Sequence, residues 1–314
     1  MNAQNLRPSN FNEFIGKNEI KHVLRVAIKN SIDNNSNLDH LIFYGPPGIG
    51  KTSLASIIAN ELNRKIHYIQ GGLIKQYSDF LDIFSMISEN DIIFIDEIHN
   101  VDYKCFELFY SLLEEFVIDI KIGKELNSQF TRFKVPMFTM ICSTTKLSNL
   151  PQPFIDRFPI KIFIDNYDEQ EIQQIITSIN SKFGNSLNED EIKIISKCSK
   201  GTPRIAINIF KRIIDFKNYE KDKFNILHTL EKIRIFPLGL ELIDIKYLEI
   251  LKKYNQPVGV NHLAQCLYMD KKMIEDKIEP YLLKMNLIVR TKIGRQLSKD
   301  GLDYLNNFHK RKYT

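Results

Sequence analysis

GPPGIGKT, residues 45–52, is the stretch of this sequence that decides its fold. It matches in full the pattern GxxxxGK followed by Ser or Thr, and it lies between an apolar run at 38–44 and a helical segment at 51–62. Glycines allow backbone N–H groups to turn inward around phosphate oxygens, and the start of the following helix adds a favourable dipole. The stretch therefore predicts a phosphate-binding loop between a buried strand and a helix.

The last two residues of this loop carry its chemistry. Lys51 supplies a mobile cation for the β- and γ-phosphates of a nucleotide, and Thr52 offers a hydroxyl ligand to Mg²⁺. Gly45, Gly48 and Gly50 allow the backbone to approach the phosphates closely. We therefore expect the ligand to be ATP with Mg²⁺.

Two carboxylates follow a later apolar run. Ile92 to Ile95 reads as a buried strand, and Asp96 and Glu97 come directly after it. Asp96 is placed to hold Mg²⁺, directly or through water. Glu97 is placed to polarise the attacking water as a general base. Together with the loop, this pair predicts ATP hydrolysis.

The segments around these motifs predict an α/β domain. Strands are predicted at 38–44, 65–69, 91–95, 136–143 and 160–164, helices at 17–33, 51–62, 79–87 and 104–115, and a β-hairpin at 117–135. Strands that alternate with helices predict a parallel sheet with helices on both faces, which binds ligands at the carboxyl ends of its strands.

The pattern changes after Asp165. Helices are predicted at 168–183, 188–199 and 203–216, with no strand between them, and three more helical stretches and two short strands at 287–297 follow from Leu240. Helices followed by a small hairpin suggest a winged helix-turn-helix. We therefore expect an ATPase domain at 1–165, a small helical lid at 166–238 and a winged helix at 239–314.

The charge of the chain is concentrated at one end. Residues 239–314 hold 14 Lys and Arg against 9 Asp and Glu, an excess of five that equals the net charge of +5 of the whole chain. A basic terminal module is a candidate for contact with a polyanion such as duplex DNA. A solvated basic tail at 310–312 is the open alternative.

The composition favours a cytoplasmic protein. No stretch approaches the apolar length of a membrane span, and residues 1–10 lack the layout of a signal peptide. The four cysteines form no CxxC pair and the histidines no HExxH, so we predict no zinc.

Three further polar residues have open interpretations. Thr144 follows an apolar strand, where its hydroxyl either touches the γ-phosphate or caps a loop. Arg157 is either a finger that acts across a subunit boundary or the partner of Asp156 in a local salt bridge. Arg204 follows a predicted helix start and either points toward phosphate or is an ordinary surface arginine.

The order of these motifs resembles the AAA+ ATPase superfamily and, within it, the RuvB family of Holliday junction branch-migration motors. The resemblance runs from about Leu6 to Tyr304. The segments that carry it are LRP at 6–8, FIG at 14–16, DH at 39–40, GPPGIGKT at 45–52, FIDEIH at 94–99, DIKIGK at 119–124, STT at 143–145, DRF at 156–158, GTPRIA at 201–206, PVG at 257–259 and EPYLL at 279–283.

The resemblance implies roles around the nucleotide. Thr144 would be sensor 1 and Arg204 sensor 2. Glu114 and Glu115, just before Phe116, match a nucleotide-proximal segment of the family, although they could equally be surface charge. The adenine pocket would be lined by Leu6, Arg7, Ile15 and Gly16, with Tyr167 nearby. The complete set of implied nucleotide contacts is Leu6, Arg7, Ile15, Gly16, Gly45, Gly48, Gly50, Lys51, Thr52, Ser53, Asp96, Glu114, Glu115, Phe116 and Tyr167.

The resemblance also implies partners. The hairpin at 117–135 would dock the junction-binding protein RuvA through apolar residues such as Ile120 and Ile122, unless it is an ordinary edge hairpin. Arg290 and Arg295 match DNA-contacting arginines on the wing. The ATPase would act as a hexameric ring that drives branch migration on Holliday junctions during recombination and repair.

The sequence departs from the family pattern at three places. Ile155 stands where the family usually has an arginine, two positions before Arg157, which remains available as the finger. Ile293 replaces a common arginine on the wing, beside Lys292, and residues 76–78 replace a loop that contains Pro-Gly. None of these changes touches the phosphate-binding loop or the acidic pair, so we expect an active ATPase.

Two other functions fit parts of the pattern. A clamp-loader subunit is also AAA+, but its arginine motif is normally Ser-Arg-Cys, and a winged helix is not its usual C-terminal domain. A nucleotide-switched DNA-binding protein with negligible turnover would fit Ile155, although the intact pair Asp96 and Glu97 argues against it. A turnover assay separates the switch from the motor.

Overall fold

The computed structural model describes residues 6–122, 129–254 and 256–312. The chain forms two compact units. The first runs to Ile175 and includes Thr202–Arg204, and the second holds Ile176–Gly201 and the chain from Ile205 onward. Each unit has its own hydrophobic core.

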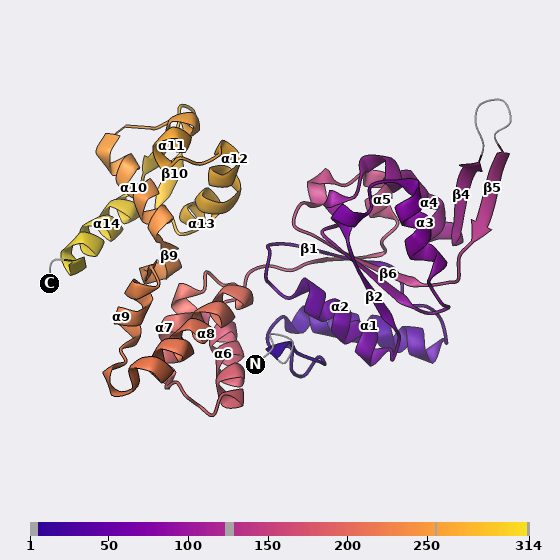
Figure 1. Cartoon of the computed structure of the whole chain (residues 1–314), viewed down its shortest axis with the longest axis horizontal. Coiled ribbons are helices and arrows are strands. Elements are labelled where there is room, and N and C mark those ends of the chain that lie inside the picture. The colour runs from indigo at the N-terminus through magenta and orange to yellow at the C-terminus, as the bar shows by residue number, and fades with distance from the viewer. Residues whose placement is uncertain (1–5, 123–128, 255, 313–314) are drawn as a thin grey trace. The chain divides into compact units, whose positions relative to one another are not determined.

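The first unit is built on a five-stranded parallel sheet, as predicted. Its strands are β1 (Leu41–Tyr44), β2 (Ile66–Gln70), β3 (Ile92–Asp96), β6 (Thr139–Thr144) and β7 (Ile160–Phe163), in the order β2-β3-β6-β1-β7. Its helices are α1 (Asn18–Asp33), α2 (Lys51–Glu61), α3 (Tyr77–Ser85), α4 (Phe106–Glu115) and α5 (Gln152–Asp156). Figure 1 shows α1 and α2 on one face of the sheet and α3, α4 and α5 on the other.

The helices cover the central strands on both faces, which explains their apolar sequences. Every residue of β6 is buried, and the four apolar residues of β3 are buried as well. A cluster of phenylalanines from α3, α4 and α5 fills the space above the sheet, with Phe80, Phe109 and Phe154 in edge-to-face contact. Burial of each such ring contributes about 1.5–3 kcal/mol. This packing holds the carboxyl ends of β1, β3 and β6 at one edge.

A buried histidine joins the sheet to the end of α4. The Nδ1 of His40 accepts the N–H of Met140 at 3.0 Å, and its Nε2 lies 3.1 Å from the carbonyl oxygen of Leu113, so Nε2 carries the proton. Burial lowers the pKa of His40, although the Leu113 carbonyl opposes this shift. The imidazole ring of His40 is therefore neutral in the folded protein.

We expect acid to weaken the fold through His40. The unfolded chain binds a proton at His40 near its ordinary pKa of about 6.5, whereas the folded chain resists it. The free energy of unfolding is therefore highest above this pH. It decreases as the pH falls below it, by up to about 1.4 kcal/mol per pH unit. Urea unfolding at a series of pH values tests this. His40→Gln should lower stability but flatten its decline in acid, and the exposed control His228→Gln should leave that decline as in the parent. Equal declines in His40→Gln and the parent would contradict the assignment.

The predicted hairpin forms apart from the sheet. Strands β4 (Val117–Ile122) and β5 (Gln129–Lys134) pair antiparallel, and β4 begins one residue after α4, through Phe116 at φ 54°. The side chains of Ile120 and Ile122 lie outside the described part of the chain. At the base of the hairpin, Arg132 forms two hydrogen bonds to Asp119 and an ion pair with Glu115 at 3.3 Å. The pair with Asp119 joins the two strands of the hairpin, and the pair with Glu115 joins the hairpin to the end of α4.

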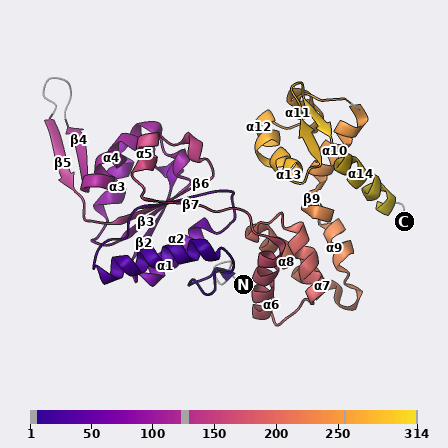
Figure 2. The ribbon, with the colours of Figure 1, turned by 180° about the vertical axis from the view of Figure 1, so that it is seen from behind.

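The second unit contains helices and a small wing. Helices α6 (Glu169–Lys182), α7 (Glu189–Cys198) and α8 (Pro203–Glu220) appear as predicted, and α9 (Ile226–Lys232) follows. The first residues of α6 and of α8 belong to the first unit. After the short pair β8 (Ile235–Phe236) and β9 (Leu240–Glu241) come α10 (Leu242–Tyr254), α11 (Val260–Leu267), α12 (Lys271–Met273), α13 (Glu279–Lys284), β10 (Ile288–Arg290), β11 (Arg295–Leu297) and α14 (Lys299–Lys312). Figure 2 shows α11, α12 and α13 near the strands of the wing. The predicted winged helix is confirmed, and no helix among the described residues is long and apolar enough to cross a membrane.

The lid helices and the winged helix meet at a tight joint within this unit. Gly239 has φ 70°, and a side chain there would overlap the carbonyl oxygen of Cys198 at the end of α7. Lys200 forms an ion pair of 2.9 Å with the buried Asp244 of α10. The hydroxyl of Tyr281 donates to the carbonyl oxygen of Leu238 at 2.7 Å. These contacts join the two parts closely and leave no space for a side chain at Gly239.

Candidate functional site

The phosphate-binding loop has the backbone that its glycines predict. Gly45, Gly48 and Gly50 all adopt positive φ, at 141°, 79° and 102°, which side chains rarely tolerate. The loop leads directly into α2, whose first residues are Lys51, Thr52 and Ser53. The free N–H groups at the start of α2 therefore face the loop, where they can bind an anion.

Lys51 is folded back on the loop. Its side chain is buried, and Nζ donates to the carbonyl oxygens of Gly45 at 2.8 Å and Pro46 at 2.7 Å. Burial lowers the pKa of Lys51, and the carboxylates of Glu97 and Asp96 oppose that shift. The loop therefore holds a cation at its centre, within the field of the acidic pair.

The acidic pair lies at the carboxyl end of β3 and is held by the end of β6. The hydroxyl of Ser143 donates to Oδ1 of Asp96. Oε2 of Glu97 accepts the N–H and the hydroxyl of Thr145, each at 3.1 Å. Glu97 has φ 51°, an uncommon conformation for a residue other than glycine. Neighbouring strands thus fix both carboxylates.

Thr144 lies beside this pair. It is fully buried, and its Oγ1 accepts the N–H of Lys146 at 3.0 Å. Nδ1 of His99 lies 2.9 Å from that Oγ1 and 3.1 Å from Oε2 of Glu97. Burial lowers the pKa of His99, and the charge of Glu97 opposes this. The sequence reasoning missed His99, although its place two residues after Glu97 in the FIDEIH segment was a usable signal.

Arg204 is brought to the phosphate-binding loop. Its backbone N–H donates to the carbonyl oxygen of Gly48 at 3.3 Å. A β-carbon on Gly48 would stand 2.9 Å from the β-carbon of Arg204 and 3.0 Å from a methyl group of Thr202. Arg204 itself is exposed. The exposed guanidinium thus belongs to the same unit as Lys51 and the acidic pair.

We expect Gly48→Ala to weaken nucleotide binding by about tenfold or more. The change imposes a positive φ on alanine, which costs about 1–2 kcal/mol, and places its methyl group against Arg204 and Thr202. Gly184→Ala is the matched control, because Gly184 has φ 73° with nothing within 4 Å of a built β-carbon. It should lower stability without changing the dissociation constant for ATP, measured by calorimetry. An equal loss of affinity in both variants would contradict this explanation.

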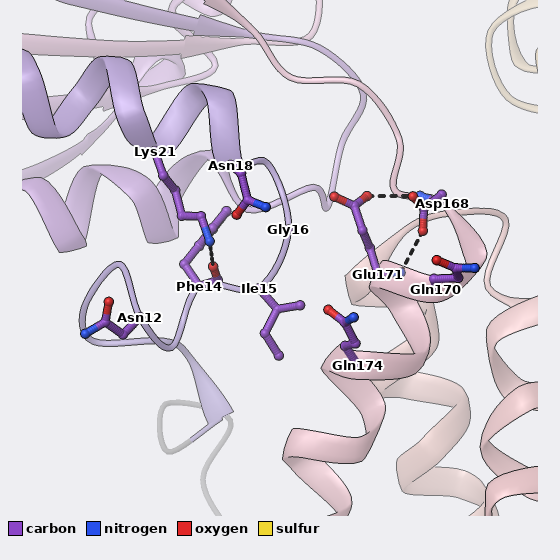
Figure 3. Close-up of a pocket in the computed structure, with 10 residues that line it drawn as sticks. All are labelled: Asn12, Phe14, Ile15, Gly16, Asn18, Lys21, Asp168, Gln170, Glu171 and Gln174. Atoms are coloured by element: carbon purple, nitrogen blue, oxygen red, sulfur yellow. Dashed lines mark hydrogen bonds between the residues drawn. The ribbon is translucent and has the colours of Figure 1, made fainter.

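The predicted adenine side lies on the N-terminal segment. The hydroxyl of Tyr167 donates to the carbonyl oxygen of Ile49 at 3.2 Å, and Gly16 has φ 78° beside the Tyr167 ring. A pocket of about 430 Å³ is lined by residues of 12–21 and 168–174, including Ile15 and Gly16 (Figure 3). Leu6 is half-buried and Arg7 exposed, and neither lines this pocket.

The predicted finger is held by α4 and α5. Arg157 donates from Nε to the carbonyl oxygen of Tyr110 at 3.1 Å and from Nη1 to that of Pro153 at 2.6 Å. Its ion-pair partner is Glu114, at 3.3 Å. Asp156 instead accepts a hydrogen bond from Gln152. The structure thus brings Arg157 together with Glu114.

The neighbours of these residues face elsewhere. Glu115 pairs with Arg132 of the hairpin, and the Phe116 ring packs against Phe138. Ile155 is buried in the core with Phe154. Of the acidic pair before Phe116, only Glu114 therefore lies at the arginine.

The wing arginines are not equally exposed. The side chain of Arg290 is 48% exposed and that of Arg295 is 13% exposed, and both form ion pairs with Glu279. The structure therefore leaves Arg290 more accessible than Arg295.

Models of one family match the chain in three parts. The model of the Holliday junction DNA helicase RuvB P-loop domain matches residues 6–164, that of the RuvB AAA lid domain matches 167–232, and that of the RuvB C-terminal winged helix domain matches 237–306.

Individual relatives cover nearly the whole chain. The Holliday junction branch migration complex subunit RuvB of Mycoplasma genitalium is 42% identical, over 98% of this chain and all of that protein. The subunit of the same name from Ureaplasma urealyticum is 41% identical over 96% of each chain. The structure of the Thermotoga maritima RuvB Holliday junction branch migration motor matches with a TM-score of 0.82 at 34% identity, covering 96% of this chain and 98% of that one.

Proposed function

The chain belongs to the RuvB family, and on that premise we propose that it is an ATP-driven DNA motor that promotes branch migration of Holliday junctions. The observation that carries this function is the arrangement at one edge of the sheet. A phosphate-binding loop, an acidic pair and a buried threonine meet there in a chain that matches RuvB proteins along almost its whole length.

We propose that Lys51 and Arg204 bind the phosphates of ATP. Lys51 would exchange its bonds to the loop carbonyls for bonds to phosphate oxygens, which carry full charge and accept stronger hydrogen bonds. The exposed side chain of Arg204 would reach the γ-phosphate from beside Gly48. The base would lie near Ile15 and Gly16.

The oxygen donors of Thr52 and Asp96 fit Mg²⁺, because this ion takes one or two protein oxygens and completes its shell with phosphates and water. Bound there, Mg²⁺ would neutralise charge on the transferred phosphoryl group. Glu97 would accept a proton from the attacking water. Its position is supported by the hydrogen bonds from Thr145.

We propose that catalysis requires a neighbouring subunit. Arg157 directly follows α5 and pairs with Glu114 of α4, and it would complete the site of the next subunit in a hexameric ring. Glu115, the last residue of α4, and Phe116, which follows it, would lie next to the boundary between the two subunits. The burial of Ile155 supports Arg157 as the arginine that this segment presents.

We propose partners for the winged helix and for the β4–β5 hairpin. The winged helix at 239–314 would contact duplex DNA phosphates, which carry no sequence information and so suit a motor that moves along DNA. The hairpin at 117–135 would dock a RuvA protein. We also propose that the ATPase domain spans 1–165 and the lid 166–238, and that the protein acts in the cytoplasm, where its DNA is.

The test is ATP hydrolysis with Mg²⁺, measured with and without duplex DNA and with a cognate RuvA. We expect DNA to stimulate turnover and RuvA to permit branch migration of a synthetic junction. Tight ATP binding without turnover under every condition would instead favour the nucleotide-switched DNA-binding protein.

A further inference from the structure

The wing carries two arginines directly opposite each other. β10 and β11 pair antiparallel, and Arg290 is in register with Arg295. Like charges opposite each other on neighbouring strands are destabilising. The wing therefore needs a nearby negative charge to hold this arrangement.

Glu279, the first residue of α13, supplies that charge to both arginines. Its side chain is fully buried, and Oε1 accepts hydrogen bonds from Nε of Arg295 at 2.8 Å and from the hydroxyl of Tyr247 at 3.0 Å. Oε2 accepts from Nε of Arg290 at 2.8 Å and from Nη2 of Arg295 at 3.2 Å. Both oxygens are thus fully engaged.

The two arginines use this carboxylate differently. Arg295 also donates to Glu275 at 2.9 Å, so its guanidinium spans two carboxylates and remains largely buried. Arg290 donates to Oε2 of Glu279 from both Nε and Nη2, and its side chain stays about half exposed. The geometry turns Arg295 inward and leaves Arg290 facing solvent.

A buried charge network of this kind is costly to build. Burial raises the pKa of Glu279, but the hydrogen bonds from Arg295 and Arg290 outweigh burial, so the pKa lies below its usual value and the carboxylate is ionised. Apolar residues of similar volume are often as stabilising as a buried ion pair. The network therefore points to a need for defined geometry at the wing.

We propose that Glu279 is the positioning residue of the wing, which holds Arg295 as an internal anchor and presents Arg290 to a DNA phosphate. The inference rests on the proposed DNA-binding function of the winged helix. It assigns to Arg295 a role that acts through Glu279, in place of the direct DNA contact that the family resemblance implied.

The test is a double-mutant cycle on DNA affinity in the full-length protein, with fluorescence anisotropy of a short labelled duplex. Glu279→Gln removes a negative charge, which by electrostatics alone should tighten binding to DNA. We expect it to weaken binding by about tenfold instead, because the arginines lose their common anchor. Arg295→Met should cost a similar factor in the parent but little more in the Glu279→Gln background.

Controls separate position from charge. Asp303→Asn, an exposed change in the same domain, should leave binding unchanged or slightly tighter. Glu279→Asp keeps the charge and shortens the side chain by one methylene group, so it should also weaken binding. This variant decides the question if thermal unfolding shows that Glu279→Gln does not fold.

Two results would overturn the proposal. The first is that Glu279→Gln or Glu279→Asp binds DNA as tightly as the parent. The second is that the loss of DNA affinity in the double variant equals the product of the losses in Arg295→Met and Glu279→Gln. Arg290→Met tests the proposed function separately. It should lower the slope of log affinity against log salt by about 0.9, as expected for one lost phosphate contact. A parent protein that does not bind duplex DNA would refute the function, whereas independent effects in the cycle would refute only the role of Glu279.

Discussion

Arg157→Ala should lower ATP turnover by about 10³- to 10⁵-fold, the range that arginine fingers contribute. The arginine directly follows α5, and its own chain holds it through Glu114 of α4 and the carbonyl oxygen of Pro153 of α5. Released from these contacts, it would stabilise charge on the phosphoryl group bound by the next subunit. Steady-state hydrolysis with saturating DNA measures the loss.

Mixing two inactive variants tests whether this arginine acts between subunits. Glu97→Gln subunits keep Arg157, and Arg157→Ala subunits keep Glu97, so rings assembled from both should contain some complete sites and recover activity. The exposed Arg212, which pairs with Asp215 on the same helix, gives a matched control whose alanine variant should hydrolyse like the parent. Mixed rings that stay as inactive as either variant alone would place the action of Arg157 within its own subunit.

Glu97→Gln should bind ATP with parent-like affinity and hydrolyse it about 10² to 10⁴ times more slowly, the contribution of a positioned general base. Glutamine keeps the size of the side chain and can still accept from Thr145, so the loop and its phosphate contacts remain. Separate measurements of binding by calorimetry and of turnover under single-turnover conditions distinguish the two steps. Glu61→Gln, an exposed change at the end of α2, is the control. Turnover at the parent rate would remove Glu97 from this role.

The phosphate-binding loop and the pair Asp96 and Glu97 were predictable because both depend on the spacing of residues within one short segment. The glycines before Lys51 require a particular backbone, and four apolar residues before Asp96 require a buried strand. Both inferences need only neighbouring residues. The same holds for the alternation of strands and helices that predicted the parallel sheet.

Contacts between residues that lie far apart in the sequence were harder to predict. The bonds that fix Glu97 come from Thr145 and His99, and Thr145 reaches it only because β6 lies beside β3 in the sheet. The inward orientation of Arg295 depends on Glu279 from another helix. A periodic pattern within one segment contains neither fact.

Element boundaries show the same limit. The apolar run from Pro136 predicts a strand, yet pairing in β6 starts at Thr139, because Met137 instead accepts the N–H of Asn90 in the preceding loop. Helix α14 was missed since its sequence is mostly polar, and its stability comes from residues such as Leu305 that pack into the winged-helix core.

The tight joint at Gly239 has a mechanical consequence. The backbone at Gly239 lies against the carbonyl oxygen of Cys198 and Lys200 pairs with Asp244, so the lid helices after Ile176 and the winged helix are joined within one compact unit. Parts joined in this way move together, so a rotation of these lid helices would carry the winged helix with it. A bulky residue in place of Gly239 would push the two parts away from each other, and their movements would become independent.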